Sequence, residues 1–265
     1  MDARLLLIDP QEDFCNPQWG TLYVPGADQD MLRVANMIGR VGKKFKHINV
    51  TLDMHHALSI FHPIFWFTAD GKHPDPFTII TSSDLVNGNF SPYHPGLFDY
   101  CKNYITSLET SGRYALCIWP MHCLIGSKGA NVVPTLFAAF LDWEITNLRM
   151  VGYVSKGSNF KTEHYSAVQA EVPDPNDPST GMNYSFIQTL EKADVIYTGG
   201  EALSHCWKNT IMDIANEFDD ANIKKFVFLE DAASSVDGFQ QVGEEFVQEM
   251  IQRGMQVSTT DKVML

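Results

Sequence analysis

The sequence predicts an α/β protein built on a doubly wound, six-stranded parallel sheet flanked by helices. Three observations favour this fold. Short apolar runs alternate with longer helical patterns, and the runs are continuously apolar, as strands buried on both faces must be. The 265 residues are also 45% hydrophobic. A chain of this length and composition can bury one large core, so residues 1–265 are predicted to form a single domain.

Six apolar runs are the predicted strands. They lie at 4–8, 47–52, 114–119, 148–154, 194–199 and 224–230. The predicted helices lie at 28–43, 97–111, 130–144, 183–192, 205–218 and 239–253. Because strands and helices alternate, the strands should be parallel and joined by right-handed crossovers.

Residues 56–96 interrupt this alternation and are predicted to form an insertion between the second and third strands. The segment is rich in Pro, Gly, Phe and His, and its aromatic residues include Phe61, Phe65, Trp66, Phe67 and Phe77. So many aromatics are not expected in a free loop, so we expect a lid over a pocket or a subunit interface. A second irregular segment, 171–183, is predicted to be an exposed loop.

The charge balance excludes some classes of partner. With 32 acidic and 19 basic residues the formal net charge is −13, which argues against a nucleic acid or an anionic membrane. No apolar run reaches transmembrane length, and the first residues are too polar for a signal peptide, so we expect a cytoplasmic protein. The five cysteines lack CxxC spacing, which argues against disulfides and zinc-thiolate sites.

Functional residues are expected at the carboxyl ends of the strands, because ligands bind there in doubly wound sheets. The six predicted strand ends all carry polar or reactive residues. In order, these are Asp9, then Asp53 with His55, Trp119 with His122, Lys156, Cys206, and Glu230 with Asp231. Such a set indicates an enzyme site more strongly than any one of its members.

Cys206 is the candidate nucleophile. It follows Gly199 and Gly200 and stands at the start of a predicted helix, where the helix dipole and a cation such as Lys156 could lower the pKa of a thiol. Asp9 could take the thiol proton and later deliver it to a leaving amine. The alternative is that Cys206 is a small buried helix residue, as free cysteines often are.

Asp53, His55 and His122 form a candidate metal site. A carboxylate and two imidazoles suit zinc, iron or manganese better than calcium, and zinc is the first expectation. His62 is a candidate fourth ligand with looser spacing. The alternative is that these histidines are polar residues that cap loop starts.

Five ordered motifs carry a family resemblance: "LLLIDPQEDF", "TLDMHH", "WPMHCLIGSKGA", "VSKGSNF" and "GGEALSHC". Spread over about residues 4 to 235, they resemble the isochorismatase-like cysteine hydrolases, and within them the nicotinamidase branch. The resemblance implies a catalytic triad at Asp9, Lys156 and Cys206. It also implies a divalent metal at the positions of Asp53, His55 and His122.

The same resemblance implies further site features. A cis peptide is expected between Glu201 and Ala202, with the amides of Ala202 and Cys206 forming an oxyanion hole. Phe14 and Trp119 match positions that sandwich a pyridine ring. The sequence departs from compact nicotinamidases in two ways. "DMHH" replaces the usual "DWHP", and 122 − 55 = 67 positions separate two of the expected metal ligands.

The expected activity is therefore hydrolysis of a small carboxamide through a cysteine thioester, with nicotinamide converted to nicotinate and ammonia as a step of NAD salvage. Two other hypotheses remain. The chain could hydrolyse another amide or a carbamoyl compound, or it could be a non-catalytic binding protein. The expected partners are a small-molecule amide and further copies of this chain in a homo-oligomer.

Overall fold

The computed structural model describes residues 1–111 and 113–264. Its centre is a six-stranded parallel sheet with the strand order β10-β9-β8-β1-β2-β7. The strands are β1 (Ala3–Ile8), β2 (His47–Asp53), β7 (Gly152–Lys156), β8 (Val195–Gly200), β9 (Phe226–Leu229) and β10 (Gln256–Ser258). The predicted fold class, a doubly wound parallel α/β sheet, is confirmed.

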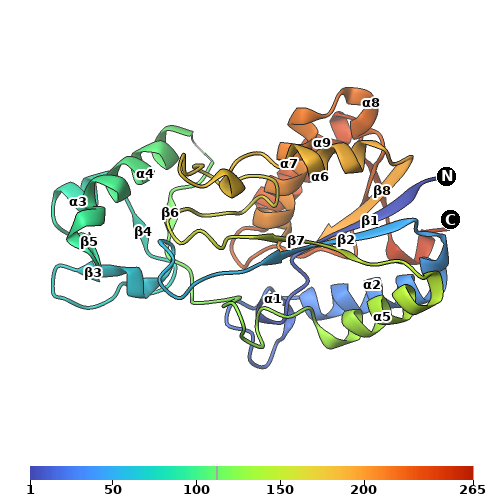
Figure 1. Cartoon of the computed structure of the whole chain (residues 1–265), viewed down its shortest axis with the longest axis horizontal. Helices are drawn as coiled ribbons and strands as arrows, with labels where there is room; N and C mark the ends of the chain where they lie inside the picture. The colour runs from blue at the N-terminus through green and yellow to red at the C-terminus, as the bar shows by residue number, and fades with distance from the viewer. Residues whose placement is uncertain (112, 265) are drawn as a thin grey trace.

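Helices cover both faces of the sheet (Figure 1). On one face lie α2 (Ala27–Val41) and α5 (Pro134–Asn147), which pack against each other. On the other face lie α6 (Tyr184–Glu191), α7 (Lys208–Glu217), α8 (Asp220–Ile223) and α9 (Gln240–Gln252). The short helix α1 (Glu12–Cys15) follows β1.

The central strand β1 shows why the sheet is buried on both faces. All six of its residues are buried. Leu6 and Ile8 belong to the apolar cluster on the α7 and α9 face, whereas Leu5 and Leu7 belong to the cluster on the α2 and α5 face. This alternation is the period of two that an extended strand imposes on its side chains.

One predicted sheet strand is wrong. The run 114–119 contributes only β6 (Leu116–Cys117), which pairs antiparallel with β4 (Ile79–Ile80) outside the main sheet. The place beside β2 is taken by β7 instead. The sixth strand is β10, which the sequence analysis missed because its short polar sequence, Gln-Val-Ser, lies at the sheet edge with two of three residues exposed.

The first part of the segment between β2 and β7, from the end of β2 through β6, forms a lobe at one end of the molecule (Figure 1). It contains β3 (Trp66–Thr68) paired with β5 (Phe90–Pro92), α3 (Ser82–Val86) and α4 (Phe98–Ser111), besides β4 and β6. Phe61, Phe65 and Trp66 are fully buried there, in the same apolar cluster as the residues around Cys206. These three aromatic residues of the insertion therefore belong to the core, whereas Phe77 and Tyr93 are exposed.

Candidate active site

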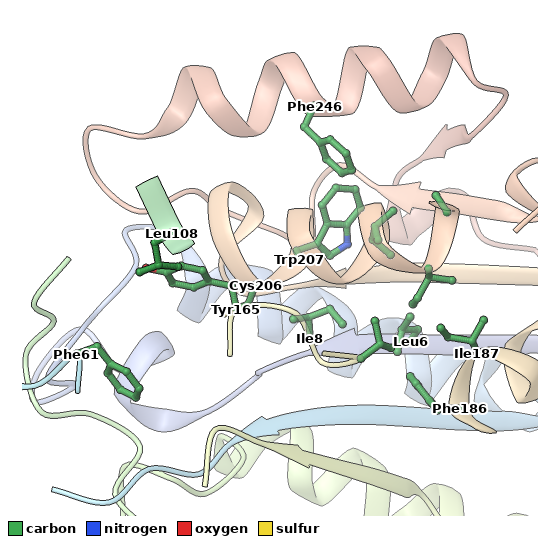
Figure 2. Close-up of a cluster of buried hydrophobic side chains, with 14 of the residues drawn as sticks. Leu6, Ile8, Phe61, Leu108, Tyr165, Phe186, Ile187, Cys206, Trp207 and Phe246 are labelled. Carbon is green, nitrogen blue, oxygen red and sulfur yellow. The ribbon is translucent and has the colours of Figure 1, made fainter. Parts of the chain in front are cut away.

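Cys206 lies in a π-helical turn, Leu203–Trp207, between β8 and α7. The turn is anchored by its neighbour Trp207, whose indole nitrogen donates to the hydroxyl of Thr198 at 3.1 Å. The Trp207 ring also contacts the ring of Phe228 and that of Phe246, which lies beside it in Figure 2. Because Trp207 fills the core, the adjacent Cys206 side chain is left to line the pocket on the other side of the turn.

Gly200, just before this turn, has a backbone φ of +111°, and a Cβ there would lie 2.1 Å from the carbonyl oxygen of Ile8. Only glycine allows β8 to approach β1 so closely in this conformation. The Glu201–Ala202 peptide bond is cis, as the resemblance implies. The carbonyl of Ala202 accepts hydrogen bonds from the amides of His205 and Trp207, which flank Cys206.

The ammonium of Lys156, at the end of β7, is the centre of a buried ion cluster. It lies 3.0 Å from Asp9 Oδ2, 2.5 Å from Asp53 Oδ1 and 3.6 Å from Cys206 Sγ. It also donates to the carbonyl of His164 at 2.7 Å. Burial alone would lower the pKa of Lys156, but the two carboxylates hold that pKa well above its ordinary value, so the amine stays charged.

Burial raises the pKa values of both Asp9 and Cys206 in this cluster. Burial raises the pKa of Asp9, against the opposing charge of Lys156. Burial also raises the pKa of the Cys206 thiol well above its ordinary value, again against Lys156. The expectation of a lowered thiol pKa is therefore wrong for this form of the protein, because desolvation of the thiolate outweighs the nearby ammonium.

A second buried cluster adjoins the first and shares Asp53 with it. Asp53, His55 and His122 each offer a ligand atom within 4.8 Å of the others. His55 Nε2 lies 3.2 Å and His122 Nε2 lies 4.0 Å from Asp53 Oδ2. Burial would raise the pKa of Asp53, but His55 and Lys156 hold it well below its ordinary value, so this carboxylate is charged.

Backbone carbonyls fix the orientation of three imidazoles around Asp53. The Nδ1 atom of His55 lies 3.0 Å from the carbonyl of Gly157, and that of His122 lies 2.7 Å from the carbonyl of Pro120. His62 Nδ1 lies 3.2 Å from the carbonyl of His56. Since Nδ1–H donates in each ring, Nε2 carries the free lone pair that a metal needs.

The buried Nε2 atoms of His55 and His62 have no hydrogen-bond partner, and the rings of His62 and His122 lie 5.4 Å apart. Burial lowers the pKa of His122 to about 4 and that of His62 to about 3, so both rings are neutral near pH 7. The neutral imidazoles of His62 and His122, close to the charged carboxylate of Asp53, fit a divalent cation. Asp9, Asp53 and Cys206 also lie within 4.8 Å of one another, but the Lys156 ammonium contacts all three and makes that group a poor cation site.

Gly157 makes room for the second cluster. Its φ is +82°, and a Cβ at this position would lie 2.4 Å from Cε1 of the His55 ring. Two hydrogen bonds from the Gln11 side chain fix the backbone of Asp53. The Gln11 amide donates to the Asp53 carbonyl and accepts from the Asp53 N–H, both at 2.7 Å. The sequence analysis missed Gln11, although it stands only two positions after Asp9.

An aromatic pocket adjoins the side chain of Cys206. It is lined by Phe14, Leu22, Val24, Asp53, Trp119, His122, Glu163, Tyr165, Ala202, His205, Cys206 and Val236. The set includes both residues predicted to sandwich a ring, Phe14 and Trp119. The Trp119 indole donates to the hydroxyl of Tyr165 at 3.0 Å, which fixes one wall.

Two further residues of this pocket escaped the sequence analysis. Glu163 accepts a hydrogen bond from the amide of His164 through Oε1, while its buried Oε2 has no partner, and burial raises its pKa to about 7. His205 is neutral near pH 7, because burial lowers its pKa to about 3. Both lie in loops or turns, so no periodic pattern could single them out.

Not every predicted strand end reaches the pocket. Trp119 and His122 line it, but from a loop after β6 rather than from a strand of the main sheet. The last strand end contributes nothing to it. Glu230 is exposed, and Asp231 accepts hydrogen bonds from the amide and hydroxyl of Thr260, which anchors the C-terminal segment.

No protein-family model and no curated protein sequence matches this chain. Solved structures do. The yeast nicotinamidase bound to the inhibitor nicotinaldehyde is 20% identical with a TM-score of 0.64, over 97% of this chain and 99% of that one.

Two microbial structures are similar over nearly their whole length. The nicotinamidase and pyrazinamidase of Acinetobacter baumanii is 20% identical with a TM-score of 0.63, over 99% of this chain and 98% of that one. The pyrazinamidase of Pyrococcus horikoshii in complex with zinc is 19% identical with a TM-score of 0.55, over 98% of this chain and 99% of that one. This chain therefore has the fold of the nicotinamidases and pyrazinamidases, as its five motifs predict.

Proposed function

We propose that this protein is a cysteine amidohydrolase that converts nicotinamide, or a close aromatic carboxamide, to the acid and ammonia. One observation carries the proposal. A buried thiol, an ammonium and a carboxylate that share one cluster lie at the floor of an aromatic pocket, with Lys156 in contact with both Asp9 and Cys206. Similar solved structures include the yeast nicotinamidase bound to the inhibitor nicotinaldehyde and PnC1 from L. infantum in complex with nicotinate, which supports the same substrate class.

The first half-reaction forms a thioester. Substrate enters with its ring between Phe14 and Trp119, and Asp9 accepts the thiol proton as the Cys206 sulfur attacks the carboxamide carbon. The carbonyl π electrons move to oxygen, and the amides of Ala202 and Cys206 stabilise that oxyanion. The C–N bond then breaks, and the proton held by Asp9 passes to nitrogen, so that ammonia leaves.

The second half-reaction restores the thiol. Asp9 removes a proton from water, whose oxygen attacks the thioester carbon, and the C–S bond breaks to release the acid. The sulfur then regains a proton from Asp9. Lys156 remains charged throughout and offsets the negative charge that moves between carboxylate and sulfur. The high thiol pKa of the resting protein fits this sequence, because the thiol is deprotonated by Asp9 during attack rather than in advance.

Asp53, His55 and His122 would hold a divalent cation, zinc by first preference and iron or manganese as alternatives, and His62 is the candidate fourth ligand. Such an ion would supply a Lewis-acid contact that orients the ring nitrogen of the substrate. The unpartnered Nε2 atoms of His55 and His62 and the zinc complex of a similar structure support this site.

The chain is proposed to act as one domain in which the insertion 56–96 forms part of the pocket wall and lid. Two contacts support this role. The Phe61 ring lies 4.7 Å from that of His55, and the Phe77 ring lies edge-on to Trp119 at 5.8 Å. Phe77 is 54% exposed and has a φ of +68°, an unusual conformation for a bulky residue, at the edge of the aromatic pocket.

We also propose a cytoplasmic location, which the cysteines support. No helix among the described residues is long and apolar enough to cross a membrane. All five cysteines are free, and four of them are buried, which fits the reducing cytoplasm that we propose for this protein.

The deciding experiment measures ammonia release from nicotinamide, pyrazinamide and benzamide. Nicotinamide and pyrazinamide should be hydrolysed, and benzamide should have a higher KM because it lacks the ring nitrogen. Turnover of other amides but not of nicotinamide would indicate a different amidohydrolase. Binding of all three compounds without any ammonia release would instead indicate a non-catalytic binding protein.

A further inference from the structure

The outer face of α5 carries an apolar stripe that no other part of the described chain covers. Phe137, Leu141 and Ile145 follow one another at intervals of four residues, which places them on one side of the helix. Leu148 follows directly after the helix end, as its cap residue. In chain order the four residues are 53%, 48%, 65% and 90% exposed. A helix normally presents polar residues to solvent on the face opposite its core contacts, so this stripe is not typical of a free surface.

The stripe continues onto the neighbouring edge of the sheet. β7 is the edge strand, and Tyr153 on it is 46% exposed. Met150, just before the strand, is 86% exposed. We call the six residues Phe137, Leu141, Ile145, Leu148, Met150 and Tyr153 the α5 face.

The α5 face has a hollow at one end and a protrusion at the other. An apolar groove lies at the start of α5, lined by Leu52, Met54, Ala130, Asn131, Val132, Pro134, Phe137 and Tyr153. At the opposite end of the helix, Leu148 and Met150 stand almost fully in solvent. Both features are apolar, but they lie at opposite ends of the helix, so Leu148 and Met150 of one copy do not cover the groove of the same copy.

We propose that the α5 face is the interface of a symmetric homodimer in which two copies of α5 pack antiparallel. A two-fold axis near the middle of the helix, between Leu141 and Ile145, brings the protruding Leu148 and Met150 of each copy to the groove of the other. Each contact then occurs twice, which is the defining property of an isologous interface.

The size of the face agrees with this occupant. Its six side chains expose on the order of 700 Å² of surface, which exceeds the roughly 300–600 Å² of the largest apolar patch on a typical monomer. It approaches the ~800 Å² per partner of a standard stable interface. A second copy of this chain therefore covers the face with little change elsewhere.

Charge opposes self-association over most of the surface, because two copies with a formal net charge of −13 repel each other. Contact is least costly through uncharged side chains, although the exposed Asp142 lies between Leu141 and Ile145 in the chain. None of the six residues of the α5 face is charged. The face also shares no residue with the lining of the catalytic pocket, so dimerisation leaves the pocket open.

Sedimentation equilibrium on the full chain tests the proposal. The wild type should behave as a dimer of two 29.8 kDa chains. Ile145→Glu and Ile145→Lys should each raise the dimer Kd at least about 100-fold, because either charge would be buried without a partner. Testing both signs separates burial of a charge from repulsion between acidic chains. Val86→Glu is the matched control, since Val86 is 61% exposed on α3 in the insertion, and it should remain dimeric.

Each variant must also keep the far-ultraviolet circular dichroism of the wild type, so that loss of the dimer is not loss of the fold. A chemical cross-link gives a second measurement. In a Leu141→Cys, Ile145→Cys variant, mild oxidation should join two chains between position 141 of one copy and position 145 of the other. A monomeric wild type, a dimer that survives both Ile145 substitutions, an open-ended assembly, or a face covered by a different protein would each overturn the proposal.

Discussion

The ion cluster around Lys156 and the imidazole cluster around His55 lie side by side, share Asp53 and differ in how complete they are. In the first, an ammonium is matched by two carboxylates and a backbone carbonyl. In the second, the buried Nε2 atom of His62 has no hydrogen-bond partner, and that of His55 faces only the carboxylate of Asp53 at 3.2 Å. The first cluster is electrostatically complete with protein atoms alone, whereas the second calls for a cation. We therefore assign chemistry to the first and substrate orientation to the second.

Removing the thiol of Cys206 should have the largest effect on kcat and should alter only the ion cluster. Cys206→Ala should lower kcat by a factor of about 10⁴ or more, because covalent catalysis is lost. Binding of the product acid should change little, because Phe14, Trp119 and the imidazoles are untouched. Ammonia release and calorimetric titration measure the two quantities.

Cys117→Ala is the control for this change, since Cys117 is half-buried in β6 away from the pocket. It should keep full activity. Iodoacetamide should also label Cys206 ahead of Cys15, Cys101, Cys117 and Cys123. Retained turnover in Cys206→Ala, or preferential labelling of another cysteine without loss of activity, would refute the assignment of the nucleophile.

Lys156→Met should be nearly as severe and should disturb both clusters. It leaves the carboxylates of Asp9 and Asp53 buried without their cation, which should cost about 3 kcal/mol of stability or more and lower kcat roughly 10³-fold. Lys156 opposes the burial that raises the pKa of Cys206. Without it that pKa should rise further, so the pH at which iodoacetamide labelling accelerates should move upward.

Urea unfolding and labelling rates across a pH series measure these effects. Lys161→Met is the matched control, because Lys161 pairs with Asp174 at 2.6 Å outside the cluster. A labelling profile of Lys156→Met that coincides with that of the wild type would remove Lys156 from the thiol environment.

Breaking the imidazole cluster should have an intermediate effect that spares the thiol chemistry. His122→Ala should raise KM for nicotinamide roughly 10- to 100-fold, with a much smaller change in kcat. The same variant should lose most of the roughly one divalent ion per chain that elemental analysis should find in the wild type.

His73→Ala is the control, because His73 lies in the insertion with Nδ1 2.7 Å from the carbonyl of Trp66 and should change neither quantity. A wild-type protein that carries no metal and whose activity is unaffected by chelators would contradict the assignment of a metal to the imidazole cluster. It would leave a metal-free amidohydrolase, for which nicotinamide is no longer the favoured substrate.

The smallest effect is expected at Tyr114, which precedes β6 and contacts the turn that carries Cys206. The Tyr114 hydroxyl donates to the carbonyl of Ser204 at 2.9 Å and accepts from the side chains of Lys208 and Asn209 at 3.3 Å, and the Tyr114 ring stacks on His205 at 5.1 Å. Tyr114→Phe keeps the ring and removes these hydrogen bonds of the hydroxyl, so kcat should fall about 5-fold with KM unchanged.

Tyr184→Phe is the control, because Tyr184 is 56% exposed at the start of α6. A change in KM alone would mean that Tyr114 shapes the pocket rather than holding the nucleophile.

The sequence predicts the ion cluster more completely than the imidazole cluster, and the reason is topological. Asp9 directly follows β1, Lys156 is the last residue of β7, and Cys206 lies in the turn after β8. The order of these parallel strands in the sheet therefore brings the three side chains together. His62 and His122 lie on loops of the long segment between β2 and β7, whose path depends on its own packing. The apolar run 114–119 was predicted to be a strand of the main sheet because it is apolar. Apolarity indicates that a segment is buried, but it does not identify the strand with which that segment pairs.

Gly157 joins the two clusters in the chain, since it follows Lys156 and its missing side chain leaves the space that the His55 ring fills. The two positions are therefore expected to vary together among related sequences. Where a relative has lost the histidine, a larger residue at the glycine position becomes sterically admissible, limited only by the left-handed backbone conformation. In a library that randomises both positions, active members should retain the pair His and Gly far more often than independent selection at each position would give.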